Sequence, residues 1–378
     1  MWQCFSGLLK RRQNANLYCD MEEKLKKTPL YSLHAGLKAR TVPFAGWEMP
    51  LYYSSIIAEH DWCREKASLF DTCHMGQLRF RGDPAYLEPA FTRAISEIPA
   101  RRAVYTMMLN GRGGIIEDLL AYRLSDEEFA FVVNAGNREK VLGMLTEMAG
   151  GKGVEDVSGA FSKIDLQGPE SHGALGNVFG ISPDLKPFGF TEAVLGGAEC
   201  ILSRTGYTGE TGFEIYCPAE KASSVWKNLL SDARVKAAGL GARDILRLEM
   251  GYPLHGSDIS EQTTPVEARL ERFVDYRKGF IGRDALEQQK SSGARRLLTG
   301  LKTGSRRAPR PGSVISCGGV EAGRVTSGAY SPSLGCGIGL GYVSAEHASP
   351  GTRVSIGTVE AVTSAVPFYV KGAGKASV

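Results

Sequence analysis

The chain has 378 residues, of which 43% are hydrophobic and 23% are charged, and its formal net charge is +4. These values are ordinary for a soluble globular protein of two or three domains. A membrane-spanning protein is excluded, since no apolar run approaches the ~20 residues that cross a bilayer. A nucleic-acid-binding protein is also excluded, since the modest positive charge is not clustered into a basic face that could bind a phosphate backbone.

The first residues differ in composition from the remainder. Segment 1–20 carries Lys10, Arg11 and Arg12, several apolar side chains and no acid before Asp20. This pattern is typical of a mitochondrial presequence, and it lacks the continuous apolar core of a secretory signal. We therefore predict a presequence or a disordered N-terminus over residues 1–27 and a location in the mitochondrial matrix.

Eight cysteines are scattered along the chain without a C-x-x-C pair or a His/Cys cluster of zinc spacing. Scattered cysteines in a chain of this length are typical of reduced thiols in a non-secretory compartment. Cys73 and His74 are sequence neighbours, so on a strand they point to opposite faces, which disfavours a nucleophile–base pair. The sequence predicts no metal site.

Helical and strand-like patterns alternate over residues 28–290. Thr28 and Pro29 resemble a helix N-cap and the first helical position. Further helices are predicted over residues 54–66, 83–95, 138–149 and 240–250. Strands are predicted over residues 69–80, 103–109, 115–124, 129–133 and 161–166, with a hairpin over 201–216. The strand over 129–133 ends at Asn134, which lies near Asp118 if consecutive strands pair. This mixture predicts an α+β fold with mixed or antiparallel sheets, in which two interleaved domains occupy residues 28–290.

The last quarter of the chain has a different composition. Residues 291–311 are basic and rich in Gly, Ser and Pro, and this shift in composition marks an interdomain boundary. The basic residues between Arg295 and Arg310 are also a candidate contact for a partner protein. From Ser313 onward short strands alternate with turns, so we predict a small C-terminal β-barrel domain over residues 291–378.

One strand carries an unusual carboxylate. Asn110-Gly111 marks a tight turn before residues 115–124. On a strand, Asp118 shares a face with apolar side chains, whereas Glu117 and Arg123 lie on the other face, which we expect to be wetter. Burying an unpaired carboxylate costs several kcal/mol. Asp118 is therefore either a catalytic group or a structural aspartate that caps a turn or pairs with an arginine.

Two further segments carry candidate ligand-binding groups. Glu214 lies between Phe213 and Ile215, so its side chain faces away from both and can enter a cavity. Arg243 and Arg247 share one helix face at a four-residue spacing. One of them can answer a carboxylate of a ligand or of the protein, and the other is expected to be structural.

An ordered series of short motifs covers residues 28–369. Each motif is weak alone, but their order is specific, and the series resembles the aminomethyltransferase family, the T-proteins of the glycine cleavage system. The motifs are Thr28-Pro29-Leu30-Tyr31, Phe44-Ala45-Gly46-Trp47, His74-Met75-Gly76, Gly113-Gly114-Ile115-Ile116-Glu117-Asp118, Asn134-Ala135-Gly136-Asn137, Leu166-Gln167-Gly168-Pro169, Thr205-Gly206-Tyr207-Thr208-Gly209-Glu210, Leu246-Arg247-Leu248-Glu249 and Val325-Thr326-Ser327-Gly328.

The resemblance implies a three-domain cloverleaf around a central hole that holds tetrahydrofolate. It implies that an aminomethyl group on the dihydrolipoyl arm of the carrier H-protein gives its one-carbon unit to tetrahydrofolate, with release of ammonia. It implies that Asp118 is the catalytic carboxylate beside the folate nitrogens. The residues that it assigns to the folate site are Glu214, Arg243, Tyr105, Val132, Asn134, Tyr207 and Tyr252.

The chain departs from the family pattern at four positions near this segment. Glu117 replaces a frequent second aspartate, His255 a common tyrosine, and Arg269 and Arg272 a glycine and an aromatic residue. The Glu117 replacement keeps the charge, whereas the changes at Arg269 and Arg272 lie in the segment near the folate hole, where we expect them to alter local packing and substrate or carrier affinity.

Two alternatives share the fold. A folate-binding assembly or repair protein carries a Lys-Gly-Cys-Tyr-type motif, but the corresponding loop here, residues 204–207, lacks cysteine. The folate domain of a dimethylglycine- or sarcosine-oxidising enzyme needs a flavin domain, and no G-x-G-x-x-G precedes residue 28.

Overall fold

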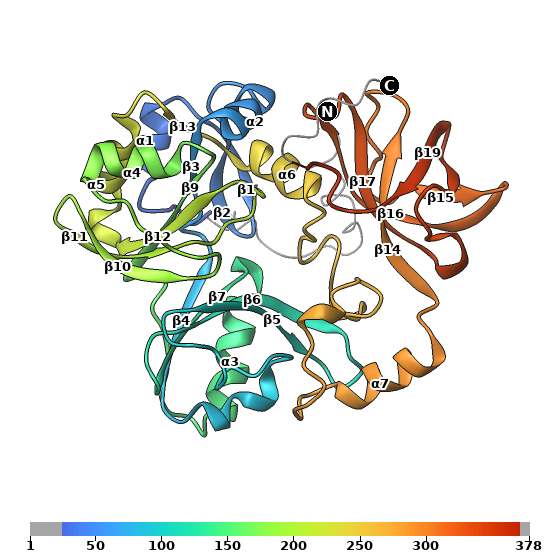
Figure 1. The fold of residues 1–378 in the computed structure, drawn as a ribbon, viewed down its shortest axis with the longest axis horizontal. Helices are drawn as coiled ribbons and strands as arrows, with labels where there is room; N and C mark the ends of the chain where they lie inside the picture. Colours follow the sequence, from blue (N-terminus) through green and yellow to red (C-terminus); the bar gives the residue numbers. More distant parts are fainter. Residues whose placement is uncertain (1–24, 371–378) are drawn as a thin grey trace, which may run out of the picture.

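The computed structural model describes residues 25–370, which form three lobes around a common centre (Figure 1). The first lobe contains a six-stranded sheet in the order β10-β11-β12-β9-β3-β13. Its strands are β3 (Ala67–Asp71), β9 (Phe161–Gln167), β10 (Phe190–Leu195), β11 (Ala198–Ser203), β12 (Gly212–Pro218) and β13 (Val235–Ala237). Every neighbouring pair is antiparallel except β3 and β13, which are parallel. The sheet is therefore mixed, as the sequence predicted.

Helices cover both faces of this sheet. Leu175 of α4 (Ser171–Phe179) and Trp226 of α5 (Ala222–Leu230) belong to one buried apolar cluster with the sheet. On the other face Phe70 of β3 packs with α2 (Ile56–Glu65) and α6 (Leu240–Glu249) through Cys63 and Leu246. The short helix α1 (Tyr31–Gly36) and the hairpin of β1 (Arg40–Phe44) and β2 (Trp47–Tyr52) complete the lobe.

The second lobe contains an antiparallel five-stranded sheet in the order β5-β6-β7-β4-β8. Val141 and Leu145 of α3 (Arg138–Met148) pack on one face of this sheet. Because β3 and β4 belong to different sheets, residues 72–75 carry the chain from one lobe to the other. The strands are β4 (Gly76–Arg81), β5 (Ala103–Leu109), β6 (Ile115–Arg123), β7 (Glu128–Val133) and β8 (Val154–Asp156).

The third lobe is a closed six-stranded barrel in the order β14-β17-β16-β15-β18-β19, which confirms the predicted C-terminal barrel. Its strands are β14 (Arg296–Thr303), β15 (Val314–Cys317), β16 (Val320–Ser331), β17 (Cys336–Ser344), β18 (Arg353–Ile356) and β19 (Val359–Ser364). Helix α7 (Arg283–Ser292) leads into β14. Residues 291–311 also contribute to the barrel itself. Buried Leu298 and Leu301 belong to its first strand, and they lie between the exposed Arg296 and the half-buried Lys302.

Three element predictions were wrong at the local level. Residues 83–95 form two 3₁₀ turns, η1 (Pro84–Tyr86) and η2 (Glu88–Ala90), because Pro89 has no amide hydrogen with which to continue a helix. The predicted strand over residues 69–80 is interrupted by the turn between β3 and β4. Thr28 does not cap α1, since its hydroxyl donates to Asp71 Oδ2 at 2.6 Å.

Helix α6 joins the lobes at the centre of the molecule (Figure 1). Its last residue, Glu249, is fully buried and accepts from His60 and Arg64 of α2 at 3.0 and 2.6 Å. Ser331 of the barrel also donates to Glu249, at 2.5 Å. One carboxylate thus ties α2, α6 and β16 together. Within residues 25–370, every helix is too short or too polar to cross a bilayer.

Candidate active site

Asp118 lies in the middle of β6, on the face of the sheet that is turned away from α3. Leu119 and Ala121, which share the face of Glu117, pack in the α3 core, and Glu117 itself has no exposed surface. Asp118 is only half-buried. The prediction that the Glu117 face is the wetter one was therefore wrong. A helix covers that face, which apolar alternation along a single strand does not reveal.

Two side chains hold the Asp118 carboxylate. Tyr105, on the neighbouring strand β5, donates its hydroxyl to Oδ2 at 3.0 Å. Asn134, at the end of β7, donates its amide to Oδ1 at 3.0 Å. The consecutive pairing of β5, β6 and β7 makes both contacts possible, as expected for Asn134 from strand order. Burial raises the pKa of Asp118, although Tyr105, Asn134 and the nearby His255 oppose that shift.

The wall next to Asp118 is apolar and aromatic. Val132 lies opposite Leu120 in the β6–β7 register, on the face of the sheet that carries Asp118. Val132 is buried in a cluster that also contains Tyr122 of β6 and Tyr216 of β12. This cluster connects the second lobe to the sheet of the first lobe.

We call this contact between the sheets of the first and second lobes the seam. Glu214 lies on its first-lobe side, in a buried polar network on β12. Lys163 of β9 donates to its Oε1 at 2.8 Å, and the Thr205 and Tyr216 hydroxyls donate to Oε2 at 2.8 and 2.9 Å. The hydroxyl of Tyr122 also reaches Oε2, at 3.3 Å. Glu214 therefore has a cation and three hydroxyls in place, which fixes its orientation at the junction of the two sheets.

Arg243 completes a charge chain with this network. Lys163 also pairs with Asp165 at 2.6 Å, and Arg243 of α6 donates to the other oxygen of Asp165 at 2.8 Å. Burial opposes ionisation of Asp165, but Lys163 and Arg243 together hold its pKa below the usual range. Arg247, in contrast, is buried against Asp258 at 2.6 Å, so it is the structural member of the pair.

Tyr207 lies near both Arg243 and Asp118, and its ring stacks on that of Tyr252. The rings of Tyr207 and Tyr252 stack with centroids 5.7 Å apart, and the Arg243 guanidinium lies 5.1 Å from the centre of the Tyr207 ring. Burial raises the pKa of Tyr207, and the charge of Asp118 contributes to that shift. The phenol of Tyr207 is therefore within electrostatic reach of Asp118. All eight predicted site residues thus belong to two adjoining groups, one on each side of the seam.

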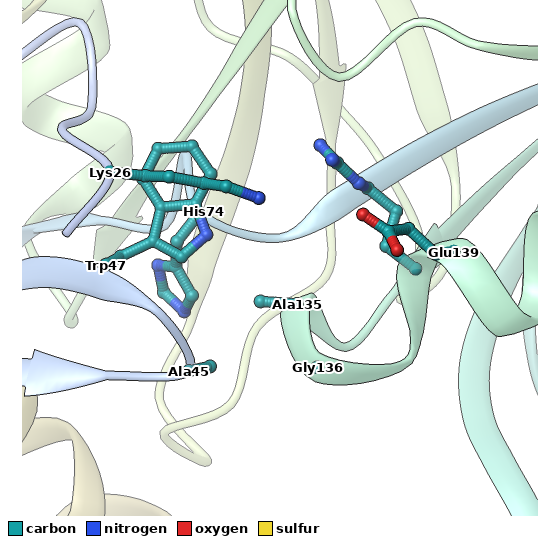
Figure 2. Close-up of a pocket in the computed structure, with 8 residues that line it drawn as sticks. Lys26, Ala45, Trp47, His74, Ala135, Gly136 and Glu139 are labelled. Atoms are coloured by element: carbon teal, nitrogen blue, oxygen red, sulfur yellow. The ribbon is translucent and has the colours of Figure 1, made fainter. Parts of the chain in front are cut away.

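A separate polar cavity lies near this seam (Figure 2). Its volume is about 210 Å³, and Figure 2 shows Lys26 and Trp47 on one side and Glu139 on the other. His74 is buried beneath it, its Nδ1 has no partner among the described residues, and burial lowers its pKa to about 4. The cavity is smaller than the ~300 Å³ at which pockets for folate-sized ligands begin. None of the eight predicted site residues lines it, so it is distinct from the predicted site.

Three of the four departures lie beside the Asp118 group, and the fourth, Arg269, donates to the Ala348 carbonyl of the third lobe at 3.2 Å. The His255 ring lies 3.2 Å from both the Asn137 amide and the Ile115 carbonyl. Arg269 adopts a left-handed backbone with φ of 57°, a conformation that glycine takes at less cost. Arg272 lies over the Phe273 ring, which in turn packs against the ring of Tyr105 at 4.7 Å.

Sequence reasoning missed the residues that connect Glu214 to Arg243 and to the second lobe. Lys163 and Asp165 are both nearly or fully buried and form the centre of the charge chain, and Tyr122 bridges the seam. A signal was present in the sequence, because the polar residues Lys163, Asp165 and Gln167 of β9 alternate with the apolar residues Ile164 and Leu166. That alternation places Lys163, Asp165 and Gln167 on one face of a buried strand.

Comparisons with known proteins agree over nearly the whole chain. Residues 30–278 match the GCVT N-terminal domain, and residues 296–369 match the glycine cleavage T-protein C-terminal barrel domain. An aminomethyltransferase of Halothermothrix orenii is 43% identical over 340 residues, which cover 88% of this chain and 95% of that protein. An aminomethyltransferase of Caldanaerobacter subterraneus is 40% identical over 348 residues, covering 89% and 93%.

A solved structure gives the same result. The crystal structure of glycine cleavage system aminomethyltransferase T from Bartonella henselae is 34% identical and has a TM-score of 0.86. The match covers 92% of this chain and 98% of that one. The predicted α+β cloverleaf with its C-terminal barrel is thereby confirmed.

The prediction of a mitochondrial matrix protein with a transit peptide is wrong. The listed relatives are bacterial proteins, and bacteria have no mitochondria, so the comparisons contradict a mitochondrial location. Basic, acid-poor composition is shared by presequences and by other N-terminal segments, which is why composition misled the prediction. Residues 1–20, on which it rested, lie outside the described residues.

The comparisons do not favour the assembly or repair protein considered as an alternative, because the matching relatives are named as transferases. The chain belongs to the aminomethyltransferase family, the T-proteins of the glycine cleavage system.

Proposed function

We propose that this aminomethyltransferase takes an aminomethyl group from the dihydrolipoyl arm of the H-protein and passes its one-carbon unit to tetrahydrofolate. The C–S bond and the C–N bond to the leaving nitrogen break, and two bonds from the carbon to folate nitrogens form. Ammonia, the free dihydrolipoyl thiol and 5,10-methylenetetrahydrofolate result. The proposal depends chiefly on one observation, the half-buried Asp118 carboxylate held by Tyr105 and Asn134.

Asp118 is the proposed catalytic residue. Breaking the C–S bond while the carbon keeps its nitrogen develops iminium-like positive charge, and so does loss of ammonia once the carbon is bonded to a folate nitrogen. A fixed carboxylate shielded from water stabilises such charge far more than water does, because it needs no reorganisation during the reaction. Asp118 also accepts a hydrogen bond from a folate nitrogen and thereby orients that nitrogen toward the carbon.

The second group of residues is the proposed holder of the pterin. A carboxylate acceptor at Glu214 suits the N–H donors along a pterin edge. The stacked rings of Tyr207 and Tyr252 offer an aromatic surface, and Arg243 offers a fixed cation beside them. Tyr105, Val132 and Asn134 complete the proposed folate site on the Asp118 side.

The proposed carrier is the lipoyl-bearing H-protein, which acts transiently with the other components of the glycine cleavage system. Its candidate contact on this chain is the basic segment 295–310. Arg306 and Arg307 of that segment are exposed on the barrel.

The direct test is to incubate the enzyme with aminomethyl-loaded H-protein and tetrahydrofolate. We expect ammonia and methylenetetrahydrofolate to form in equal amounts, and only when both substrates are present. A folate-binding protein without transfer activity binds tetrahydrofolate in calorimetry but releases no ammonia above the level of the loaded carrier alone. That second outcome would overturn the proposed function.

A further inference from the structure

We propose that Glu117 is a positioning residue for the transfer reaction, which holds the Asn134 amide against Asp118 and couples the site to His255. This inference rests on the proposed function, since it assigns Asp118 the catalytic role. It concerns a position at which this chain carries a glutamate in place of the family's frequent aspartate.

The first step in the argument is the set of contacts that Glu117 makes. Its Oε1 accepts from the backbone amide of Asn134 at 2.6 Å and from the Asn134 side chain at 2.9 Å. The same side-chain amide donates to Asp118 Oδ1 at 3.0 Å. Glu117 and Asp118 point to opposite faces of β6, so the Asn134 amide connects two carboxylates that do not touch each other.

The second step is the hydrogen count at Asn137. Its amide nitrogen lies near three acceptors: Glu117 Oε2 at 2.5 Å, the Ile116 carbonyl at 3.0 Å and His255 Nδ1 at 3.2 Å. An amide NH₂ has only two hydrogens. The hydrogen bond to His255 therefore competes with the one to Glu117, which links the two side chains. His255 Nε2 lies 3.2 Å from the carbonyl of Ile115 and donates to it.

The third step is the electrostatics of the pair. Glu117 has no exposed surface and no cation within ion-pair distance among the described residues. Burial and the neighbouring charge of Asp118 raise the pKa of Glu117 to about 8, against the opposing effect of the Asn134 and Asn137 amides. The groups that face the pair are Tyr105 from β5, the two asparagines that follow β7, His255 from the loop after α6, and Tyr207 from the loop before β12. Near neutral pH the pair therefore carries about one negative charge, and ionisation of Glu117 adds a second.

Three substitutions separate positioning from charge. Glu117→Ala removes both the hold on Asn134 and the titratable carboxyl group. Glu117→Asp keeps the carboxyl group on a shorter side chain, and Glu117→Gln keeps an oxygen for Asn134 but removes the titration. Glu147→Gln, on the exposed side of α3, is the matched control.

The experiment measures transfer from loaded H-protein at saturating tetrahydrofolate between pH 6 and 9, together with KM for tetrahydrofolate. We expect Glu117→Ala to lower kcat about tenfold with KM nearly unchanged, because only the placement of Asp118 suffers. Glu117→Asp should recover most of that loss. The wild-type profile should show an inflection near the Glu117 pKa of about 8, and Glu117→Gln should lack it.

Two results would overturn the inference. In the first, Glu117→Ala transfers at the wild-type rate with the wild-type pH profile. In the second, all three variants lose folate affinity and kcat together with an unchanged inflection, as a merely structural residue would cause. Absence of transfer by the wild-type enzyme is a different outcome, which rejects the proposed function itself.

Discussion

Buried carboxylates in this enzyme are compensated in different ways, and the difference indicates which one is free to act. Glu214 and Asp165 share the buried Lys163, and Glu249 pairs with Arg64 and His60. Asp118 receives hydrogen bonds from two neutral groups and pairs with no lysine or arginine of residues 25–370. Glu117 also lacks a cation, but it is fully enclosed and held by the Asn134 and Asn137 amides, whereas the half-buried Asp118 can be reached by a cationic intermediate that supplies the missing partner.

At the folate side of the site, Arg243→Ala should weaken tetrahydrofolate binding by about 10- to 100-fold. That range corresponds to the loss of one charge-assisted contact of about 1.5–3 kcal/mol. Asp165 keeps its contact with Lys163 in this variant, so the fold should survive. Titration calorimetry measures the change, with Arg324→Ala on the barrel surface as the control. Equal affinity of Arg243→Ala and the wild type would remove Arg243 from the folate site.

Glu214→Gln tests the opposite edge of the proposed pterin site. The amide keeps the side-chain volume but replaces one acceptor oxygen by a donor, which opposes the hydroxyls of Thr205 and Tyr216. We expect folate affinity to fall about tenfold while the rate constant of transfer at saturating folate changes less. A variant that binds folate normally but transfers slowly would instead place Glu214 in the chemical step.

Among the elements, α6 is the one on which the arrangement of the lobes depends. Removing the Glu249 side chain leaves Arg64 and His60 without their buried partner, and breaking such a cluster costs about 3–5 kcal/mol. We expect Glu249→Ala to lower the free energy of unfolding in urea by that amount. Glu346→Ala, on an exposed turn of the barrel, is the control. A loss below about 1 kcal/mol would show that packing alone holds α6 in place.

Helices and strands were predicted correctly where a local sequence pattern specified them. The prediction failed at residues 83–95, where a local signal was overlooked, and at β14, where tertiary packing determines the strand. The hairpin of β5 and β6 was predicted within a residue of its bounds, because Asn110-Gly111 and the following β-formers specify it locally. Residues 83–95 failed because two prolines broke an apolar spacing that suited a helix. β14 was missed because Arg and Lys flank its buried leucines, and barrel closure buries only one face of each strand.

For the molecule as a whole, the two perturbed glutamates predict a stability maximum on the acidic side of neutrality. The pKa of Glu249 is lowered to about 2 by His60, Arg64 and Ser331 despite burial, so its contribution is present above pH 4.5 and lost as the pH falls toward 2. The pKa of Glu117 is raised to about 8, so its contribution is present below pH 4.5 and lost as the pH rises through 8.

Urea unfolding at pH 5, 6.5 and 8 measures this dependence. We expect the free energy of unfolding of the wild type to fall from pH 5 to pH 8 by more than about 1 kcal/mol. Glu117→Gln should show a flatter dependence over the same range, whatever its absolute stability. Parallel curves for the two proteins would show that Glu117 titrates at its ordinary pKa in the fold.

Contacts within the site could be predicted from the sequence only where they join strands that follow each other along the chain. Asp118 and Asn134 were linked in advance because β6 and β7 are consecutive strands. Lys163 and Tyr122 were not, since their meeting at Glu214 depends on how two sheets approach each other. Asp118, Glu214 and Arg243 were candidates from the sequence pattern, the full set of eight folate-site residues came from resemblance to a family, and their roles stay predictions until substitutions are measured.

The central claim is that Asp118 acts in the transfer step. Asp118→Asn keeps the side-chain volume and removes the charge, so the measurement that tests it most directly is single-turnover transfer from loaded H-protein, with tetrahydrofolate affinity determined on the same preparation. We predict a rate lower by about tenfold or more with folate affinity within about threefold of the wild type. A wild-type rate at saturating substrates would contradict the claim.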